Sequence, residues 1–230
     1  MTLLGFGDFT QVGPQRGSNS GGLYEHAVSG ERWYMKHPNS ERQGYNEVIA
    51  ARCYRRMGFD APEYRMVDNG MVAAKYRDGL PESSTASALR NSDVVQESFL
   101  PSALIANWDV IGLVYDNCLY NPETMREPVF IDFGGSFDTR AMGGHKQFTA
   151  TKIPALDGFT DPSINQSAHS VFKGMRPRHF DASKERIKQF GSDEIRDVLD
   201  GIPLRGAQTR RERLESRRDI LLGKDYEDVV

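Results

Sequence analysis

The sequence has few of the features that mark secreted or membrane proteins. Only two of its 230 residues are cysteines, Cys53 and Cys118, and they show no metal-ligand spacing. We therefore expect free thiols rather than a disulfide framework. No apolar run approaches the roughly 18 residues that suggest a membrane helix. Residues 1–10 lack the basic start and small-residue cleavage site of a signal peptide, so we expect a cytoplasmic protein that does not act at a membrane.

A large excess of charge of one sign is also lacking. The net charge is −3, which gives no overall attraction to nucleic acid. The basic stretch at residues 205–218 also contains Glu212 and Glu215, and we interpret it as a solvated helix face. Nucleic-acid binding would depend on this stretch alone, and we expect none. Four of the five histidines show no zinc spacing either: His37, His145, His169 and His179.

What is present is the composition of an ordinary globular protein, with 38% hydrophobic and 27% charged residues. Two hairpins are expected in the first third, because apolar and aromatic segments flank short Gly-containing turns. The paired segments are residues 23–28 with 32–35 and residues 63–67 with 71–74. Between the hairpins, apolar residues at helical spacing predict a helix over residues 46–57, ended by Gly58.

The character of the chain changes after residue 79. Residues 81–87 are rich in Ser and Thr and are typical of a linker or of the entry to a new lobe. We expect a helix over residues 99–108, short strands at 118–120 and 129–131, and a loop-rich region from 149 to 180. Three closing helices are expected at residues 181–190, 192–199 and 209–222, the last begun by a Thr209–Glu212 capping box. The fold class is therefore α+β, with a sheet-rich part over residues 1–79 and a mostly helical part over residues 80–230.

Several segments have residue types suited to holding a phosphate chain and a metal ion. The first is a Gly-rich loop before the first hairpin, whose backbone N–H groups could approach phosphate oxygens closely: Gly17, Ser18, Asn19, Ser20, Gly21 and Gly22. An ordinary flexible turn explains this loop equally well, since it is neither a P-loop nor a G-x-G-x-x-G run. Lys36 ends a predicted strand, and Glu47 lies early in the next helix, where it could pair with Lys36 or complement the helix dipole.

Two further segments carry acidic and amide side chains. Asp109 follows Asn107-Trp108 and could accept a proton, while Asn117 precedes an apolar strand and could bind a metal ion. Helix caps and turns are the alternative roles. Asp132 follows an apolar strand and precedes Phe133-Gly134-Gly135, a position suited to Mg²⁺ that bridges phosphates. All these segments in this order outweigh the structural explanation of each one alone.

In this order, the motifs resemble those of the protein-kinase-like superfamily over roughly residues 13–140. The Gly-rich loop and residues 106–109 look closer to compact bacterial and phage branches, such as HipA-type kinases, than to eukaryotic protein kinases. The resemblance implies a bilobal fold with ATP and Mg²⁺ (or Mn²⁺) between the lobes, and an unidentified protein or small-molecule acceptor. It also implies that Lys36 contacts the phosphates, Glu47 fixes Lys36, Asp109 orients the acceptor hydroxyl, and Asn117 and Asp132 bind metal.

The sequence departs from the kinase pattern in three ways. The usual spacing from the catalytic aspartate to the metal-binding asparagine is five residues, but Asp109 to Asn117 is eight. The pair Asp116 and Asn121 has the usual five-residue spacing. We prefer Asn117 as the metal-binding residue because it leads directly into the strand at 118–120. No Ala-Pro-Glu motif follows Asp132. The Gly-rich loop contains Ser18 and Ser20, and HipA-type kinases place a regulatory serine there, so we expect autophosphorylation at one of these serines.

The leading hypothesis is thus a Ser/Thr protein kinase. On the same fold, a small-molecule kinase and an AMP transferase remain alternatives. A pseudokinase used as a scaffold is the alternative from another functional class, although a scaffold has no physical need for the four polar residues retained at metal- and phosphate-binding positions: Lys36, Asp109, Asn117 and Asp132.

Overall fold

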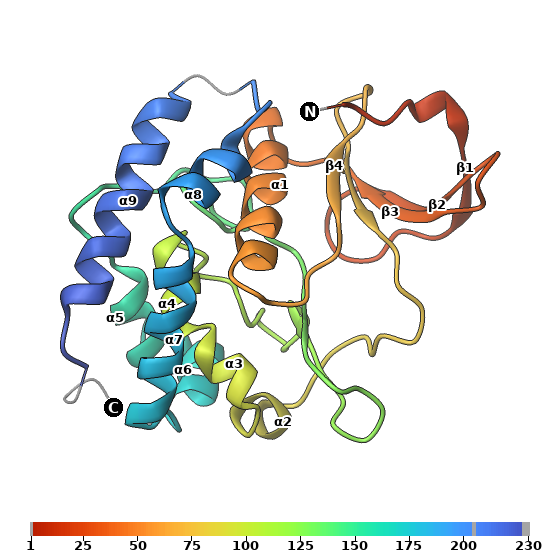
Figure 1. The fold of residues 1–230 in the computed structure, drawn as a ribbon. Helices are drawn as coiled ribbons and strands as arrows, with labels where there is room; N and C mark the ends of the chain where they lie inside the picture. The colour runs from red at the N-terminus through yellow and green to blue at the C-terminus, as the bar shows by residue number, and fades with distance from the viewer. Residues whose placement is uncertain (1, 204–205, 227–230) are drawn as a thin grey trace.

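The computed structural model describes residues 2–203 and 206–226, and its N-terminal part is an antiparallel sheet (Figure 1). The sheet has the order β1-β2-β3-β5-β4. Its strands are β1 (Phe9–Gly13), β2 (Gly21–His26), β3 (Arg32–Lys36), β4 (Tyr64–Met66) and β5 (Val72–Lys75). Both predicted hairpins are confirmed, as β2 with β3 and β4 with β5. Strand β1 was not predicted, because its burial pattern is that of a mostly exposed edge strand and lacks the alternation that identifies strands.

Helix α1 (Glu41–Arg56) begins five residues earlier than the sequence predicts. The Ser40 hydroxyl accepts a hydrogen bond from the Gln43 backbone N–H at 3.2 Å, which caps the helix. Three polar residues near its start are buried: Gln43, Asn46 and Glu47. Apolar periodicity could not show this first turn, because its inward face is polar. Figure 1 shows α1 between the sheet and the C-terminal helices.

The C-terminal part is mostly helical and contains one small hairpin. Its helices are α2 (Ala86–Arg90), α3 (Asp93–Glu97), α4 (Phe99–Leu104), α5 (Ala155–Thr160), α6 (Gln166–Phe172), α7 (Pro177–Gln189), α8 (Ser192–Leu199) and α9 (Ala207–Gly223). The predicted strands at 118–120 and 129–131 form the antiparallel pair β6 (Cys118–Leu119) and β7 (Val129–Phe130). Among the described residues, none of these helices combines the length and apolar character needed to cross a membrane.

The linker expected at 81–87 is largely confirmed, because residues 81–85 are irregular and Thr85 caps α2. Two other expectations for the C-terminal part are wrong. The region from 149 to 180 is not mainly loop, because it contains α5, α6 and the start of α7, and Phe159, Val171 and Phe172 bury short apolar faces there. Helix α9 begins at Ala207, after Gly206 with φ +84°, so Thr209 lies inside the helix and forms no capping box.

The basic stretch is also more than a solvated face. Arg210 is 7% exposed and Arg217 is fully buried, whereas Arg205 lies outside the described residues. The Arg217 guanidinium donates to four backbone carbonyls, those of Ala103, Leu104, Thr149 and Lys152. Burial lowers the pKa of Arg217 to about 10. This side chain therefore fixes α9 to α4 and to the segment before α5.

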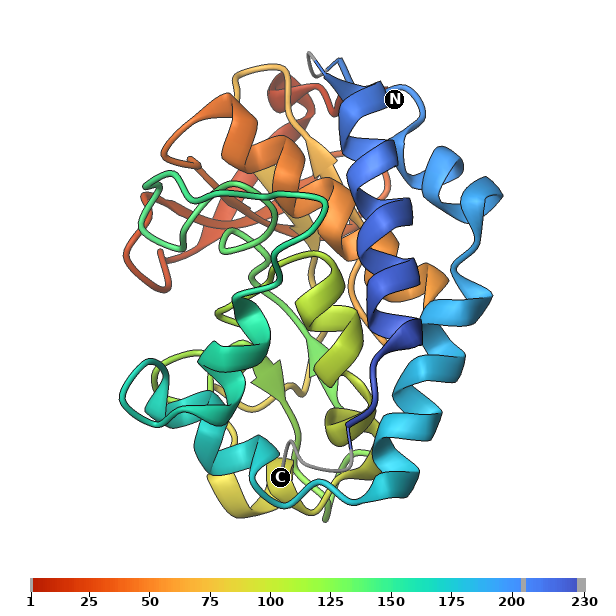
Figure 2. The ribbon, with the colours of Figure 1, turned by 90° about the vertical axis from the view of Figure 1, so that its left-hand side faces the viewer.

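A single hydrophobic core joins α1 to the helical part. The Tyr54 ring packs against Phe59, Phe130 and Phe133 with ring centres 4.9 to 5.5 Å apart. Phe133 also meets Tyr64 of β4, so the core reaches the sheet. In the second view, α1 crosses behind the loops that follow β7 (Figure 2). The core thus holds the segment around residues 132–134 against α1 and the sheet.

Candidate active site

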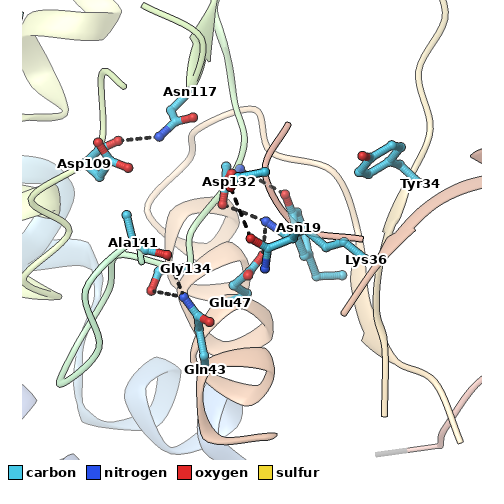
Figure 3. A network of polar contacts seen from close by, with 12 residues as sticks. Asn19, Tyr34, Lys36, Gln43, Glu47, Asp109, Asn117, Asp132, Gly134 and Ala141 are labelled. Carbon is cyan, nitrogen blue, oxygen red and sulfur yellow. Dashed lines mark hydrogen bonds and ion pairs between the residues drawn. The ribbon is translucent and has the colours of Figure 1, made fainter. Parts of the chain in front are cut away.

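Lys36 lies between two carboxylates that come from distant parts of the chain (Figure 3). Its Nζ is 2.8 Å from Asp132 Oδ1 and 3.3 Å from Glu47 Oε2. Lys36 comes from the end of β3, Glu47 from the buried face of α1, and Asp132 from the chain just after β7. The Glu47 side chain is 1% exposed, whereas that of Asp132 is 50% exposed. The three predicted residues therefore meet in one charged cluster with an open side at Asp132.

The backbone at Asp132 has the left-handed conformation, with φ +51°. Aspartate adopts this conformation more readily than most residues. The backbone N–H of Asp132 donates to the Tyr64 hydroxyl at 3.1 Å, which fixes the residue to β4. Phe133 is followed by two glycines, at which space is limited: a Cβ at Gly134 would lie 3.1 Å from Glu47 Oε1, and one at Gly135 would lie 3.0 Å from the Asp109 Cβ.

Charge pairing and burial set the pKa values in this cluster. Burial alone would lower the pKa of Lys36, but Asp132 and Glu47 raise it above its usual value. Partial desolvation by the surrounding protein raises the pKa of Asp132, but the charge and hydrogen bond of Lys36 lower it below its usual range. Burial raises the pKa of Glu47 despite the opposing charge of Lys36. Lys36 and Asp132 therefore each favour the charged form of the other.

Asp109 and Asn117 are joined through the backbone of Asp109. The Asn117 Nδ2 donates to the Asp109 carbonyl oxygen at 2.7 Å, and Figure 3 shows its amide oxygen directed away from Asp109. Gly112, with φ +75°, turns the intervening loop back, so the eight-residue spacing still brings the two residues together. In the alternative pair, the Asn121 side chain instead accepts from the Glu123 N–H at 3.0 Å, within the turn after β6.

The Asp109 carboxyl group is a weaker acid than usual. Burial, followed by the charges of Asp132 and Asp116, raises its pKa to about 6. At neutral pH the group is mostly ionised, yet it is a stronger base than an exposed aspartate. This combination is what a proton-accepting side chain needs, because the best base has a pKa near the working pH.

The Gly-rich loop lies beside Lys36 and is hydrogen-bonded to His37, the residue after Lys36. The Asn19 amide donates to the His37 carbonyl at 2.8 Å, and the His37 N–H donates to the Ser20 carbonyl at 2.8 Å. Figure 3 shows Asn19 next to Lys36. Ser18 and Ser20 are exposed. The predicted loop and Lys36 therefore share one end of the β2–β3 pair.

Two residues of the site were missed by the sequence analysis. Gln43 lies one helical turn before Glu47, and its Nε2 donates to the carbonyls of Gly134, Arg140 and Ala141 at 3.0 to 3.3 Å (Figure 3). The i, i+4 spacing to Glu47 was the signal that could have revealed it. The Lys146 ammonium donates to the Ala106 carbonyl at 2.6 Å and to the Gly135 carbonyl. No local pattern marks Lys146, because only the tertiary fold brings it to Asp109.

The oxygen donors fit a magnesium ion that is held partly by a substrate. Mg²⁺ is usually bound by one or two protein oxygens together with substrate phosphates. The exposed carboxylate of Asp132 and the free amide oxygen of Asn117 provide such donors. Among the described residues, no group of three or more His, Cys, Asp or Glu side chains could hold a metal ion by itself.

No protein-family model and no curated protein matches this sequence. The chain is similar in fold to the Helicobacter pylori proinflammatory kinase CtkA, with a TM-score of 0.63 over 100% of this chain and 97% of that chain, at 14% identity. A choline/ethanolamine kinase family protein from Mesorhizobium loti has a TM-score of 0.35 over 97% of this chain and 91% of its own, also at 14% identity. The first likeness confirms the predicted α+β, protein-kinase-like fold.

Proposed function

We propose that this protein is an ATP- and Mg²⁺-dependent phosphotransferase that phosphorylates Ser or Thr of a protein acceptor. The observation that carries the proposal is the Lys36 ammonium between Glu47 and Asp132, on the protein-kinase-like fold. The nucleotide would lie between residues 1–79 and residues 80–230, under the Gly-rich loop. The similarity of that loop to HipA-type kinases supports placing the protein in this bacterial and phage branch.

Each residue has a distinct role in this proposal. Lys36 contacts the α- and β-phosphates, and Glu47 holds it in place. Asp132 and Asn117 would bind Mg²⁺, which when bound neutralises charge on the phosphates. The acceptor hydroxyl oxygen forms a bond to the γ-phosphorus, the bond from that phosphorus to the β–γ bridging oxygen breaks, and the hydroxyl proton passes to Asp109. ADP is the leaving group.

The test uses ATP labelled separately at the γ- and α-phosphates, with Mg²⁺. Wild type is compared with Asp132→Ala and with Asp181→Ala, a control at an exposed aspartate of α7. We expect transfer of the γ label by wild type and the control but not by Asp132→Ala. Transfer of the α label would instead identify an AMP transferase. Absence of both transfer and ATP binding would contradict the proposal and leave a scaffold on a kinase-like fold.

The Gly-rich loop adds a proposal about regulation. Ser18 and Ser20 are exposed beside Lys36, which makes each accessible to a second molecule of the protein. We expect one phosphate on this loop after incubation with Mg-ATP, seen by mass spectrometry of the intact protein and its peptides. An unmodified loop in an otherwise active enzyme would contradict autophosphorylation at these positions.

A further inference from the structure

Two cations lie over the ring of Trp108, the residue before Asp109. The guanidinium carbon of Arg140 is 5.6 Å from the ring centre, and the Lys146 Nζ is 5.3 Å from it. Within residues 2–203 and 206–226, neither cation has a carboxylate at ion-pair distance; their hydrogen-bond acceptors are backbone carbonyls. An aromatic face offsets only part of one positive charge. This place therefore has an uncompensated positive charge.

This uncompensated positive charge is reflected in a lowered pKa of Lys146. Burial, followed by the nearby charge of Arg140, lowers the pKa of Lys146 to about 7. The carboxylates that oppose this shift are Asp109 and Asp138, and Asp138 is already bonded to Arg42 and Asn46. An anion placed against Arg140 and Lys146 would favour the charged lysine, and binding of the anion would be strengthened in turn.

A third donor at the same place lacks an acceptor. The indole N–H of Trp108 is buried, and no atom of the described residues accepts a hydrogen bond from it. A buried donor without a partner costs about 1–3 kcal/mol, so such donors are rare in folded proteins. Toward the part of the chain that the structure describes, the Arg140 guanidinium donates only through its Nε, to the His145 carbonyl. The ring of Trp108, the residue before Asp109, thus has two cations over it and an unsatisfied N–H at its edge.

The surroundings suit an extended acceptor better than a small one. Leu113 and Val114, in the loop after Asp109, are 85% and 63% exposed. Ile164 is 55% exposed, and its neighbour Asn165 donates to the Trp108 carbonyl at 2.8 Å, so this turn borders the same loop. Exposed apolar side chains next to a functional site are typical of surfaces that bind other polypeptides.

We propose that Trp108, Arg140 and Lys146 form an anion subsite for the acceptor, and that the acceptor is a polypeptide with an acidic residue next to the target Ser or Thr. This inference rests on the proposed function. In the proposed site, Lys36 binds the phosphates of the nucleotide. The anion subsite lies instead beside Asp109, and its two cations come from the segment after Gly135. The same two cations would repel a quaternary ammonium or aminoglycoside acceptor.

The binding test needs no catalysis. The protein has two tryptophans, so tryptophan labelled with ¹⁵N gives two indole N–H signals, and Trp108→Phe assigns them. Wild type is titrated with the blocked peptide Glu-Ser-Glu and, separately, with Lys-Ser-Lys. We expect a saturable shift of the Trp108 signal with the acidic peptide alone. The shift should disappear in Arg140→Gln and remain in Arg126→Gln, a control at an exposed arginine of the β6–β7 turn.

Two results would overturn the proposal: no saturable shift in wild type, or an equal shift in Arg140→Gln. A third would reassign the subsite. If a non-hydrolysable ATP analogue with Mg²⁺ produces the shift and blocks the acidic peptide, the subsite binds the γ-phosphate rather than the acceptor. The acceptor assignment requires that the peptide still binds when the analogue is present.

Kinetics separate this inference from the proposed function. For the acidic peptide, Arg140→Gln should raise KM about 10-fold, the loss expected for one charge-assisted hydrogen bond, and leave KM for ATP unchanged. A peptide-induced shift without any phosphate transfer would refute the kinase proposal and retain the subsite. Transfer with no preference between acidic and basic peptides would retain the kinase and refute the subsite.

Discussion

Two charged clusters lie near Asp132 and Asp109, and their charges are balanced in opposite ways. Around Lys36, one ammonium meets two carboxylates, Glu47 and Asp132, within 3.3 Å. Around Trp108, two cations share the neighbourhood of Asp109 without a carboxylate in ion-pair contact, as far as the described residues show. The first cluster is complete in the protein itself, whereas the second lacks a negative partner. We infer that the first is preorganised for the nucleotide and that the second awaits the acceptor.

Buried Arg217 shows that a missing carboxylate alone does not mark a site. Its guanidinium donates to four carbonyls, so its hydrogen-bonding capacity is largely used within the protein. Among residues 2–203 and 206–226, the Arg140 guanidinium donates one hydrogen bond and the Trp108 indole N–H donates none. The difference between a structural cation and a candidate subsite therefore lies in the donors left over.

Removing the Asp132 side chain should lower turnover more than any other change considered. Asp132 belongs to the cluster around Lys36 and is the most exposed carboxylate in it. Asp132→Ala removes the partner of Lys36 and one of the two proposed metal donors. We expect turnover to fall at least as far as the loss of a positioned base would lower it, by about 10²–10⁴-fold. Asp181→Ala should keep wild-type turnover in the same phosphate-transfer assay. Near wild-type turnover in Asp132→Ala would remove the basis for the proposed site.

Asp109→Asn should lower kcat by about 10²–10⁴-fold while KM for ATP stays nearly constant, because the side chain is assigned to the acceptor. Asp116→Asn is the matched control, since it removes a carboxylate from the same loop. If Asp116→Asn were the more damaging change, the catalytic pair would be Asp116 with Asn121. Steady-state kinetics with saturating ATP distinguish the two outcomes.

The sequence identified the residues of the cluster around Lys36 far better than those of the cluster around Trp108. Each residue of the Lys36 cluster lies next to or near the start of a predicted helix or strand: Lys36, Glu47 and Asp132. Their positions relative to these elements, and the order of the elements along the chain, were enough to identify them. Gln43 was missed because it lies in a first helical turn with a polar inward face, which apolar periodicity does not show. Arg140 and Lys146 lie in an irregular segment, and only the tertiary fold places them over Trp108. Strand β1 was missed because its edge is exposed.

Arg217→Met tests the structural cation. It keeps much of the side-chain volume but leaves four buried carbonyls without their donor, so we expect a loss of about 3 kcal/mol in the free energy of unfolding. Arg213→Met, on the same helix and partly exposed, should change it by less than about 0.5 kcal/mol. Urea denaturation measures both. Equal free energies of unfolding of the two variants would show that the carbonyls of α4 do not need a hydrogen-bond donor from α9.

The smallest effect is a shift in pH dependence that links the two clusters. Because burial, followed by Asp132 and Asp116, raises the pKa of Asp109 to about 6, its ionised, proton-accepting form is lost as pH falls through that value. We expect kcat/KM for the acceptor to fall about 10-fold per pH unit below it. The charge of Lys146 lowers the pKa of Asp109, so Lys146→Met should move this limb to higher pH. Arg126→Gln should leave it in place. A limb that stays fixed in Lys146→Met would mean that the cation does not act on Asp109, and that the two clusters are independent.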